Sequence, residues 1–535
     1  MSQFDPHVEG AYPKDHVSED YTFNNQHRHS ASVKDQLATW HANRGDRSFV
    51  RCMIPSIRGT PPGELPTTKN PIKLFRMVSP FAWLMFFSGW LAWTVDGYDF
   101  FCVSLTLDSL ADQFKVKPAK ITTAITLTLL FRSLGAVIFG ILSDRYGRKW
   151  PLVCCLLLIM CFELGSGFVN TYTQFLAVRS LFGVTMGDKS DSANSALENV
   201  PADARGLLSG IMQQGYAVGY LLAAVINLTI VQYSKPHWRT IYFFGAGFSF
   251  LAACIRASLP ESRQFLLARE EAKARGLTAK ETTKNFIQEL GTMFRTNCQY
   301  LLYVWIAHSA VYIASHGSQD LYPTYLKTTK KLSPKLASKA TIISNCGAIV
   351  GGTIAGYSSQ YVGRRFAILI CAFWTAAFLP LWILPKSFGG LAAGGFFVQA
   401  GVQGAWGVVP IYLGEVSPPA FRALFAGLSY QLGNMASSGA AQIEATAGNS
   451  LKLAGTNIPD YAAITGILLG AVIAWGIICV ICGPEADGAL FEQAKVAYQR
   501  GGGEADPTEL FNHDKPDHSH IEKTMAIEHN ENELK

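Results

Sequence analysis

The sequence predicts an all-helical membrane protein with twelve transmembrane helices in two pseudo-symmetric bundles of six. Three observations support this fold class. Only 16% of the 535 residues are charged and 49% are hydrophobic, whereas soluble domains usually carry about a quarter charged residues. The apolar residues gather in segments of roughly 20, the length that a helix needs to cross a bilayer. The two halves of this apolar region also repeat one another.

Twelve apolar segments follow one another between two polar ends. A charged, amphipathic stretch divides them six and six. We therefore expect an N-terminal bundle at 79–258, a cytoplasmic linker at 259–297 and a C-terminal bundle at 298–482. The polar ends, 1–78 and 483–535, bury too little apolar surface to fold alone, so we expect disordered cytoplasmic tails. The expected spans lie near residues 79–104, 120–142, 150–169, 173–196, 207–231, 238–258, 298–326, 337–359, 365–385, 388–413, 421–445 and 461–482.

The internal repeat is visible in two pairs of segments. "GILSDRYGRK" (140–149) is echoed by "GYSSQYVGRR" (356–365), and "ENVPADARGLLSG" (198–210) is echoed by "EVSPPAFRALFAG" (415–427). A similar offset pairs Asp99 with Asp320. Such a duplicated unit is typical of transporters whose site lies between two bundles. We therefore expect Asp99 and Asp320 to belong to a two-sided site.

The distribution of Lys and Arg in short loops predicts the orientation. With both termini in the cytoplasm, the loops "DRYGRK" and "GRR" face inward, as the rule prefers. Two basic loops, "KVKPAK" (115–120) and "KTTKKLSPKLASK" (327–339), would then face outward. They are either lysines that flank helices or a basic mouth that concentrates an anionic substrate.

Several motifs resemble those of the major facilitator superfamily. "GILSDRYGRK" is similar to the superfamily's loop between spans 2 and 3, "RSLFGVTMG" (179–187) to its span-4 motif, and "LPES" (259–262) to its landmark after span 6. "SHGSQDLYPT" (315–324) resembles a signature of fungal Jen-type monocarboxylate:proton symporters. Arg132 within "TLTLLFRSLGAVIFG" resembles the same family. The resemblance implies a plasma-membrane symporter that moves lactate, pyruvate and similar acids with a proton.

The sequence departs from the family pattern in two places. Tyr312 stands where the signature has Asn, and the fourth span carries Asp188, Lys189 and Asp191 where relatives have small and aromatic residues. We expect these positions to influence which substrate is chosen and whether it is moved.

Polar side chains inside the expected spans predict the substrate site. Residues four apart share a helix face, so His308, Tyr312, His316, Asp320 and Thr324 form one stripe. Intramembrane ionisable groups usually mark substrate or ion pathways, although polar groups can also serve helix contacts. Arg132 either anchors a carboxylate through its planar fork or pairs with an aspartate that the substrate displaces. The expected substrate-binding residues are Arg132, Gln214, Tyr216, Tyr312, His316, Gln319, Asp320, Gln431 and Asn434.

A second set of residues is expected to couple transport to protons. A histidine changes its charge near physiological pH, and a carboxylate beside it can share the proton. The set comprises His316, Asp320, Asp96, Asp99 and Arg179. Arg179 either belongs to this path or pairs with Asp188 or Glu163.

Charged residues at the inner ends of the spans predict a gate. They either form a charge network that closes the inner side or anchor the helices at the interface. They are Asp144, Arg145, Arg148, Glu198, Arg205, Arg364, Glu415 and Arg422.

The sequence shows no feature typical of an enzyme. It has no nucleotide-binding P-loop and no His/Cys/Asp/Glu spacing suited to a metal, so we expect neither metal nor cofactor. A net charge of +6 spread along the chain makes nucleic acid an unsuitable partner. The expected partners are the lipid bilayer, a small carboxylate and a proton, with cytoplasmic regulatory proteins on the tails. The alternatives are a transporter of another organic acid (a dicarboxylate or a sugar acid), an antiporter, or a non-transporting carboxylate receptor.

Overall fold

The structure is a computed structural model that describes residues 70–188, 197, 200–261, 266, 279–417, 422–453 and 455–482. The two expected tails, Lys189, Asp191, Glu198 and most of the expected linker lie outside the described residues. The side chains of Asp144, Asp188, His308 and Arg422 also lie outside them.

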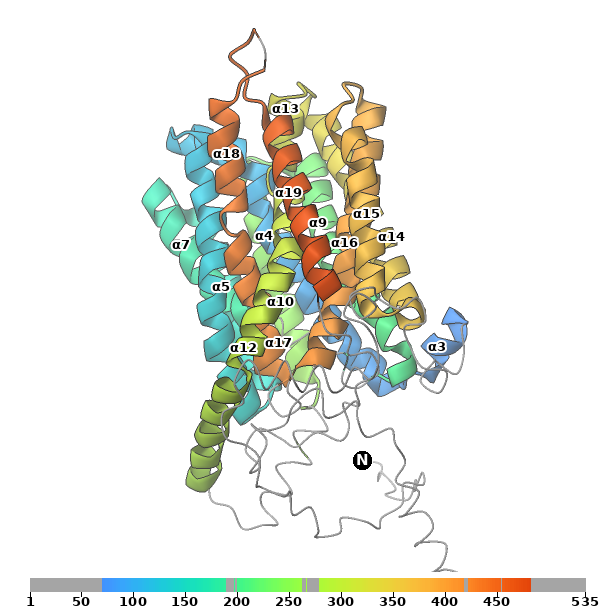
Figure 1. The fold of residues 1–535 in the computed structure, drawn as a ribbon. Coiled ribbons are helices and arrows are strands. Elements are labelled where there is room, and N and C mark those ends of the chain that lie inside the picture. The colour runs from blue at the N-terminus through green and yellow to red at the C-terminus, as the bar shows by residue number, and fades with distance from the viewer. Residues whose placement is uncertain are drawn as a thin grey trace, which may run out of the picture. The chain divides into compact units, whose positions relative to one another are not determined.

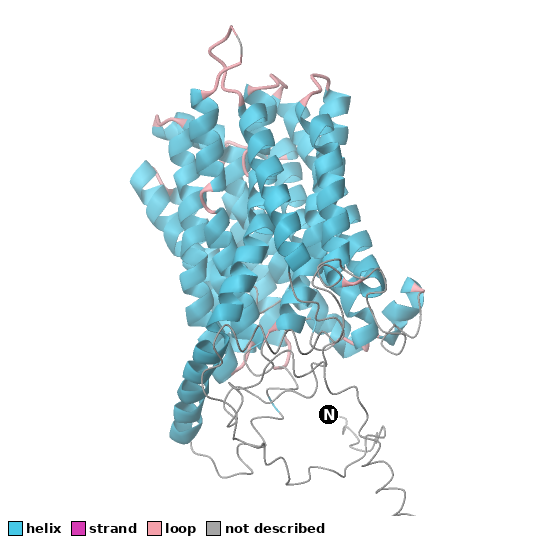
Figure 2. Ribbon diagram, viewed as in Figure 1, coloured by secondary structure: helices cyan, strands magenta, loops and turns pink. Residues whose placement is uncertain are grey.

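The described part of the chain is built from α-helices joined by short loops (Figure 2). Most of the long helices run side by side along one direction in a single bundle (Figure 1). The helices are α3 (Pro71–Met77), α4 (Pro80–Phe114), α5 (Pro118–Tyr146), α6 (Lys149–Phe168), α7 (Tyr172–Thr185), α9 (Ala202–Thr229), α10 (Arg239–Ser258), α12 (Ala279–Gln319), α13 (Tyr322–Thr328), α14 (Pro334–Val362), α15 (Arg364–Ile383), α16 (Phe388–Val416), α17 (Arg422–Ser437), α18 (Ala440–Ser450) and α19 (Tyr461–Cys482), with 3₁₀ turns η1 (Met186–Asp188) and η2 (Val231–Tyr233).

Local sequence signals explain where these helices begin and end. The Ser79 and Ser333 side chains cap α4 and α14 by accepting a hydrogen bond from a backbone N–H, and a proline follows each cap, which suits the first helical position. Gly147 and Gly363 end α5 and α14 at φ 97° and 87°, values that glycine adopts at little cost. These two glycines occupy matching positions of the two echoed loops, so the repeat is present in the backbone.

Seven helices of the described residues are long and apolar enough to cross a membrane, or eight if the bent pair α3 and α4 is counted as one span. The seven lie within α5, α6, α9, α10, α15, α16 and α19. The twelve-span expectation exceeds this number for two reasons. The α12, α14 and α17–α18 segments carry many polar residues, and α7, with 14 residues, is too short within the described part of the chain. Those polar residues lower the hydropathy of helices that still run alongside the apolar ones (Figure 1).

The two halves of the chain, α4–α10 and α12–α19, meet along two matching helix pairs. Helix α5 packs against α17, and α9 packs against α14. Helices α5 and α14 both end in the echoed loop, so they occupy equivalent places in their halves. The interface therefore has the crossed pattern expected of two pseudo-symmetric bundles.

Three expected spans differ from the observed helices. The span at 298–326 is broken after Gln319, so Thr324 lies on α13 and does not continue the stripe of His316 and Asp320. The span at 421–445 is broken between α17 and α18 at Ser438 and Gly439, and α7 ends at Thr185, well before residue 196. Glycine and small polar residues at the α17–α18 break weaken the helix, which a hydropathy pattern does not register.

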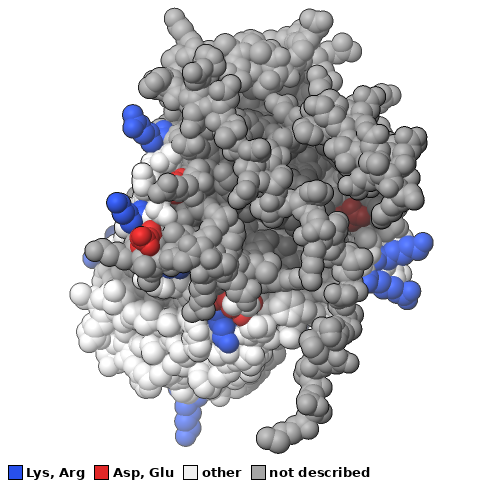
Figure 3. All heavy atoms as spheres, turned by 90° about the horizontal axis from the view of Figure 1, so that it is seen from below, with Lys and Arg blue, Asp and Glu red and all other residues white. Residues whose placement is uncertain are grey.

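The end of the bundle at which α12 begins and α5 ends is the lower end in Figure 1. Figure 3 looks onto this end and shows Lys and Arg side chains projecting from its rim. Arg148 and Lys149 of the echoed loop donate backbone N–H groups to the Glu261 carboxylate at 3.1 and 3.0 Å. The loop is therefore tied to the chain segment that follows α10.

Candidate functional site

An ion pair in the centre of the bundle joins α4 to α5. Arg132 Nη2 donates to Asp96 Oδ2 at 2.5 Å, and only 3% and 1% of these side chains are exposed. Of the two alternatives for Arg132, the structure therefore shows pairing with an aspartate of the first long helix. The same Nη2 lies 3.4 Å from Met186 Sδ, at the turn that follows α7.

Six aromatic side chains form a cluster beside this ion pair, with the Phe100 ring 5.5 Å from the Arg132 guanidinium carbon, and we call them the aromatic cage. Each ring contacts another ring of the set at centroid distances between 4.5 and 6.4 Å. All are buried, and they come from both halves of the chain. The cage consists of Trp93, Phe100, Tyr216, Tyr312, Trp406 and Tyr430.

The cage holds several hydrogen-bond donors that have no partner within the described part of the chain. They are the indole N–H groups of Trp93 and Trp406, the hydroxyls of Tyr216 and Tyr312, and Arg132 Nε. Buried polar groups normally find a partner, so such a gathering needs an explanation such as a ligand or water. Several buried donors in one cluster that also contains a guanidinium suit an anion with several acceptor oxygens.

A chain of polar contacts runs through the second half next to the cage. His316 Nδ1 lies 3.2 Å from both carboxylate oxygens of Asp320, and its Nε2 lies 3.3 Å from Asn434 Oδ1. Asn434 in turn donates from Nδ2 to Gln431 Oε1 at 2.7 Å. The histidine thus bridges α12 and α17 with a carboxylate on one ring nitrogen and an amide on the other.

The Phe100 ring contacts both Arg132 and His316. The Arg132 guanidinium carbon lies 5.5 Å from the ring centroid, and the His316 ring packs edge-on at 5.4 Å. Arg132 and His316 therefore face one aromatic ring from two sides without a direct contact recorded between them.

Tyr312 occupies the position at which the family signature has Asn. Its ring packs against Trp406 at 4.5 Å and Tyr430 at 5.1 Å, and it covers Gly433 so closely that a side chain there would collide with it. Tyr312 is therefore a wall of the cage, as its place on the expected stripe suggested.

Two residues expected near the centre lie among helices of the first half. Asp99 Oδ2 accepts a hydrogen bond from Ser249 of α10 at 3.0 Å. Arg179 pairs with Glu163 at 2.5 Å and donates to the Asp99 backbone carbonyl at 3.1 Å. For Arg179 the structure thus shows the pairing with Glu163. Asp99 thus contacts α10 in this conformation, and its place with Asp320 in a two-sided site stays a prediction.

Two of the expected amides serve contacts between helices. Gln319 donates to Gln399 of α16 at 2.8 Å, within a polar seam that joins α12 to α16. Gln214 donates to the Ile349 carbonyl at 3.1 Å and to Thr353, so it crosses from α9 to α14. In this conformation neither residue is among the groups that surround Arg132.

The inner-end charges form a defined network around Arg364. This residue binds Glu415 through two hydrogen bonds, Nη2–Oε1 at 2.8 Å and Nε–Oε2 at 3.1 Å, and also donates to Ser359. Gln360 accepts a hydrogen bond from the Gly206 N–H of the other half at 2.9 Å. Arg205 donates to the Val200 carbonyl at 3.1 Å, whereas Arg145 lies over the Tyr146 ring.

The two halves also touch at the upper end. Thr122 and Thr126 of α5 donate to Gln442 Oε1 at 2.6 Å and to the Ser438 carbonyl at 2.9 Å. Lys327 after α12 pairs with Asp108 of α4. Because the halves meet both above and below, the aromatic cage is enclosed in this conformation.

The upper basic loop is partly engaged in contacts of its own. Lys330 donates to the Ile383 carbonyl, and its burial, aided by nearby Lys386, lowers the pKa of this lysine from its usual value. Lys331 is exposed and adopts φ 57°. Only part of this loop is therefore available to attract an anion.

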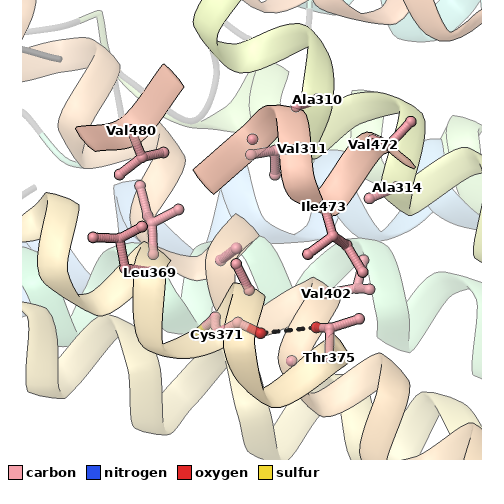
Figure 4. A pocket seen from close by; sticks show the side chains of 15 residues that line it. Ala310, Val311, Ala314, Leu369, Cys371, Thr375, Val402, Val472, Ile473 and Val480 are labelled. Carbon is pink, nitrogen blue, oxygen red and sulfur yellow. Dashed lines mark hydrogen bonds between the residues drawn. The ribbon is translucent and has the colours of Figure 1, made fainter. Parts of the chain in front are cut away.

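A separate apolar groove lies between α12, α15, α16 and α19, with an empty volume of about 450 Å³. Figure 4 shows its lining, in which the hydroxyl of Thr375 is turned to the Cys371 carbonyl at 2.8 Å. None of the expected site residues lines this groove. It offers no charge for a carboxylate.

Sequence reasoning did not single out Trp93, Phe100, Trp406 or Tyr430. Aromatic residues are common in membrane helices, so their number alone did not indicate which of them line a site. Trp93 lies three residues before Asp96, and Phe100 lies four residues after it, which places all three on one helix face. That spacing is the signal by which two walls of the cage could have been found.

Comparisons with known proteins agree with this fold. A family profile described as "Sugar (and other) transporter" matches residues 84–498. The chain belongs to this family of membrane transporters, and its fold is that of the major facilitator superfamily. It is accordingly a multi-pass membrane protein and a member of a transporter family, not of an enzyme family.

Three curated relatives illustrate the range of the family. The "Carboxylic acid transporter protein homolog" of Saccharomyces cerevisiae is 34% identical over 78% of this chain and 70% of its own length. The sialic acid transporter NanX of Escherichia coli is 24% identical over 78% and 98%. The cis,cis-muconate transport protein of Acinetobacter baylyi is 25% identical over 68% and 86%. The resemblance to carboxylate transporters of the superfamily, first seen in the motifs, is thereby confirmed.

Solved structures support the fold alone. The proton:xylose symporter XylE bound to 6-bromo-6-deoxy-D-glucose superposes with a TM-score of 0.61 at 19% identity, over 76% of this chain and 97% of that chain. A partially occluded, inward-open conformation of XylE from E. coli gives a TM-score of 0.60 at 18% identity, over 77% and 100%.

Proposed function

We propose that this protein is a proton-coupled plasma-membrane symporter of short monocarboxylates such as lactate and pyruvate. Transport would proceed by alternating access of one central site to the two sides of the membrane. The observation that carries the proposal is the cation Arg132, buried beside a cage of hydrogen-bond donors that have no partner in the described part of the chain. The printed names of relatives that transport carboxylic acids support the same substrate class.

The cage favours a small, planar anion. A carboxylate can accept from the Arg132 fork and from the Tyr216 and Tyr312 hydroxyls, while an aromatic wall covers its short carbon chain. The rings contact one another directly, so a bulky substrate would have to displace them. A lactate-sized acid meets both requirements.

The charge of the site explains why a proton would accompany the substrate. Arg132 is already neutralised by Asp96 at 2.5 Å. A second carboxylate next to this pair would leave an excess negative charge in a dry interior, which is costly. A proton taken up by Asp96, or by the His316–Asp320 pair, restores neutrality and frees the guanidinium for the substrate.

The proposed architecture has twelve spans and cytoplasmic termini. The bundles 79–258 and 298–482 would rock against each other about the α5–α17 and α9–α14 contacts, with 259–297 as a cytoplasmic linker. The tails would bind cytoplasmic regulatory proteins. The inner-end residues Arg145, Arg148, Arg205, Arg364 and Glu415, with Asp144, Glu198 and Arg422, would form the inner gate.

Uptake measured together with external pH tests the proposal. The protein is produced in a host cell that lacks its own carboxylate permeases, and labelled lactate is added at acidic external pH. Symport predicts accumulation of label with simultaneous alkalinisation of the medium. Arg132→Gln should abolish both, whereas the control Asp112→Asn, an exposed acid near the end of α4, should retain both.

The alternatives give different results in the same assay. Uptake of a dicarboxylate or sugar acid without uptake of lactate would point to another substrate. Label that enters only against a preloaded internal acid, with no alkalinisation, would point to an antiporter. Saturable binding without uptake would identify a receptor, in which the tails carry the signal.

A further inference from the structure

A buried carboxylic acid that neither the sequence motifs nor the central site uses lies in α18. Glu444 is 1% exposed, and neither of its carboxyl oxygens makes a hydrogen bond of normal geometry within the described part of the chain. The Thr465 hydroxyl of α19 is the polar group beside it. Helix α18 has no lysine or arginine in its own sequence.

Glu444 lies next to the helix that carries His316 and Asp320. An added Cβ at Gly317, the residue directly after His316, would stand 3.4 Å from Glu444 Oε1. The Glu444 carboxyl therefore packs directly against the α12 backbone beside His316. Asp320 is the ionisable group whose charge acts on Glu444, and His316 is the titratable group bound to Asp320.

The other helices packed against α18 supply no counter-charge to this carboxyl. Helix α19 is uncharged over its whole length, Tyr461–Cys482. Two α5 residues that form hydrogen bonds in this region are uncharged: Thr122 donates to Gln442 of α18, and Thr126 donates to the Ser438 carbonyl just before α18. An ionised carboxylate that has the Thr465 hydroxyl beside it but no cation among the described residues is disfavoured in a dry interior, so we expect the acid to hold a proton in this closed conformation.

We propose that Glu444 is a second proton-binding site that exchanges its proton with the His316–Asp320 pair during transport. In the closed conformation the proton is on a Glu444 oxygen. When the upper contacts between α5 and α18 open, water reaches the carboxyl, the Glu444 O–H bond breaks and an N–H bond forms on His316 or an O–H bond on Asp320. The proton is the species that moves, and no redox partner is involved. This inference rests on the proposed proton symport.

Infrared spectroscopy of the purified full-length protein tests the proton on Glu444 without any substrate. At neutral pH the wild type should show the C=O stretch of a protonated carboxylic acid, and Glu444→Gln should lose that component. The control Glu281→Gln, at an exposed position of α12, should keep it. A wild-type spectrum that Glu444→Gln leaves unchanged would overturn the proposal.

Transport assays test the exchange step. Glu444→Gln should lose accumulation driven by a proton gradient, while exchange of labelled for unlabelled substrate across preloaded vesicles continues. Unchanged accumulation would overturn the exchange. A variant that loses both activities but still binds substrate would also overturn it, since Glu444 would then serve the conformational change. If the wild type transports no carboxylate, the proposed function fails, yet the infrared result still decides whether Glu444 holds a proton.

Discussion

Asp96 and Arg132 form an ion pair of 2.5 Å in which both side chains are almost fully buried. A substrate carboxylate that binds Arg132 must compete with Asp96. Asp96→Asn removes the competing charge but keeps the shape of the side chain. We expect lactate binding to persist in this variant, while its uptake no longer responds to an inward proton gradient. Uptake of labelled lactate at several external pH values measures this, and an unaltered pH dependence would rule Asp96 out of coupling.

Arg132→Lys tests the geometry of the cation apart from its charge. Lysine keeps the charge but lacks the planar fork that holds a carboxylate by two hydrogen bonds. Loss of one charge-assisted hydrogen bond corresponds to about a tenfold lower kcat/KM. Initial uptake rates over a range of lactate concentrations measure it, and equal kinetics in the two proteins would show that a point charge suffices.

Tyr312→Phe removes a hydroxyl that has no partner in the described part of the chain. If this hydroxyl binds the substrate, its loss should raise KM about three- to tenfold, the worth of one hydrogen bond. Tyr322→Phe is a matched control, because its hydroxyl is bonded to the Leu391 carbonyl at 3.3 Å, outside the cage. An unchanged KM in Tyr312→Phe would show that Tyr312 shapes the aromatic cage but does not bind the substrate through its hydroxyl.

Tyr312→Asn should widen the choice of substrate. The smaller amide leaves empty the space that the ring fills between Gly433 and Trp406. Competition of larger organic acids against labelled lactate measures the change, and we expect acids that do not inhibit the wild type to inhibit this variant. Inhibition profiles that coincide would place the size filter elsewhere.

Glu415→Gln tests the inner charge network. Removing one partner of a buried ion pair leaves the other charge uncompensated and costs about 3–5 kcal/mol. The thermal midpoint of the purified protein should therefore fall clearly below that of Glu281→Gln, which changes an exposed acid. A double change with Arg364→Met should recover part of the loss, and additive effects would mean that the two residues do not act as a pair.

Lys331→Gln tests the basic mouth. Lys331 is exposed, whereas Lys330 already donates to a backbone carbonyl. If the loop attracts anionic substrate, Lys331→Gln should raise the apparent KM at low ionic strength and have no effect at high salt, where charges are screened. A salt-independent KM would leave these lysines the role of flanking the helices.

The parts of the site that sequence reasoning found have local signals. The pairing of His316 with Asp320 follows from their spacing of four on one helix, and Arg132 is conspicuous as a cation in an apolar run. The fold was predictable because its signals are also local: the length of each span and the repeated loops can be recognised from runs of consecutive residues. The breaks after Gln319 and at Gly439 depend on small local differences that hydropathy averages out.

The remainder depends on which helices become neighbours. Asp99 and Asp320 align in the repeat, but α10 packs beside α4 and presents Ser249 to Asp99. Gln214 and Gln319 carry the same amide group as Gln431, yet their amides form hydrogen bonds with residues of α14 and α16. Glu444 stands at the end of an expected span, where an acid ordinarily reaches the membrane surface, and only the packing of α12 and α19 around it shows that it is buried.

Part of the contact between α9 and α14 is made by backbone. Gly210 faces Gly352 and Gly356 so closely that a side chain at Gly210 or Gly356 would strike the opposite backbone. Interlocking side chains would fix two helices in one register, whereas the surface at these glycines is smooth. One half of the molecule can therefore rotate against the other at this helix pair. A single methyl group added at the closest of these glycines would obstruct that rotation sterically.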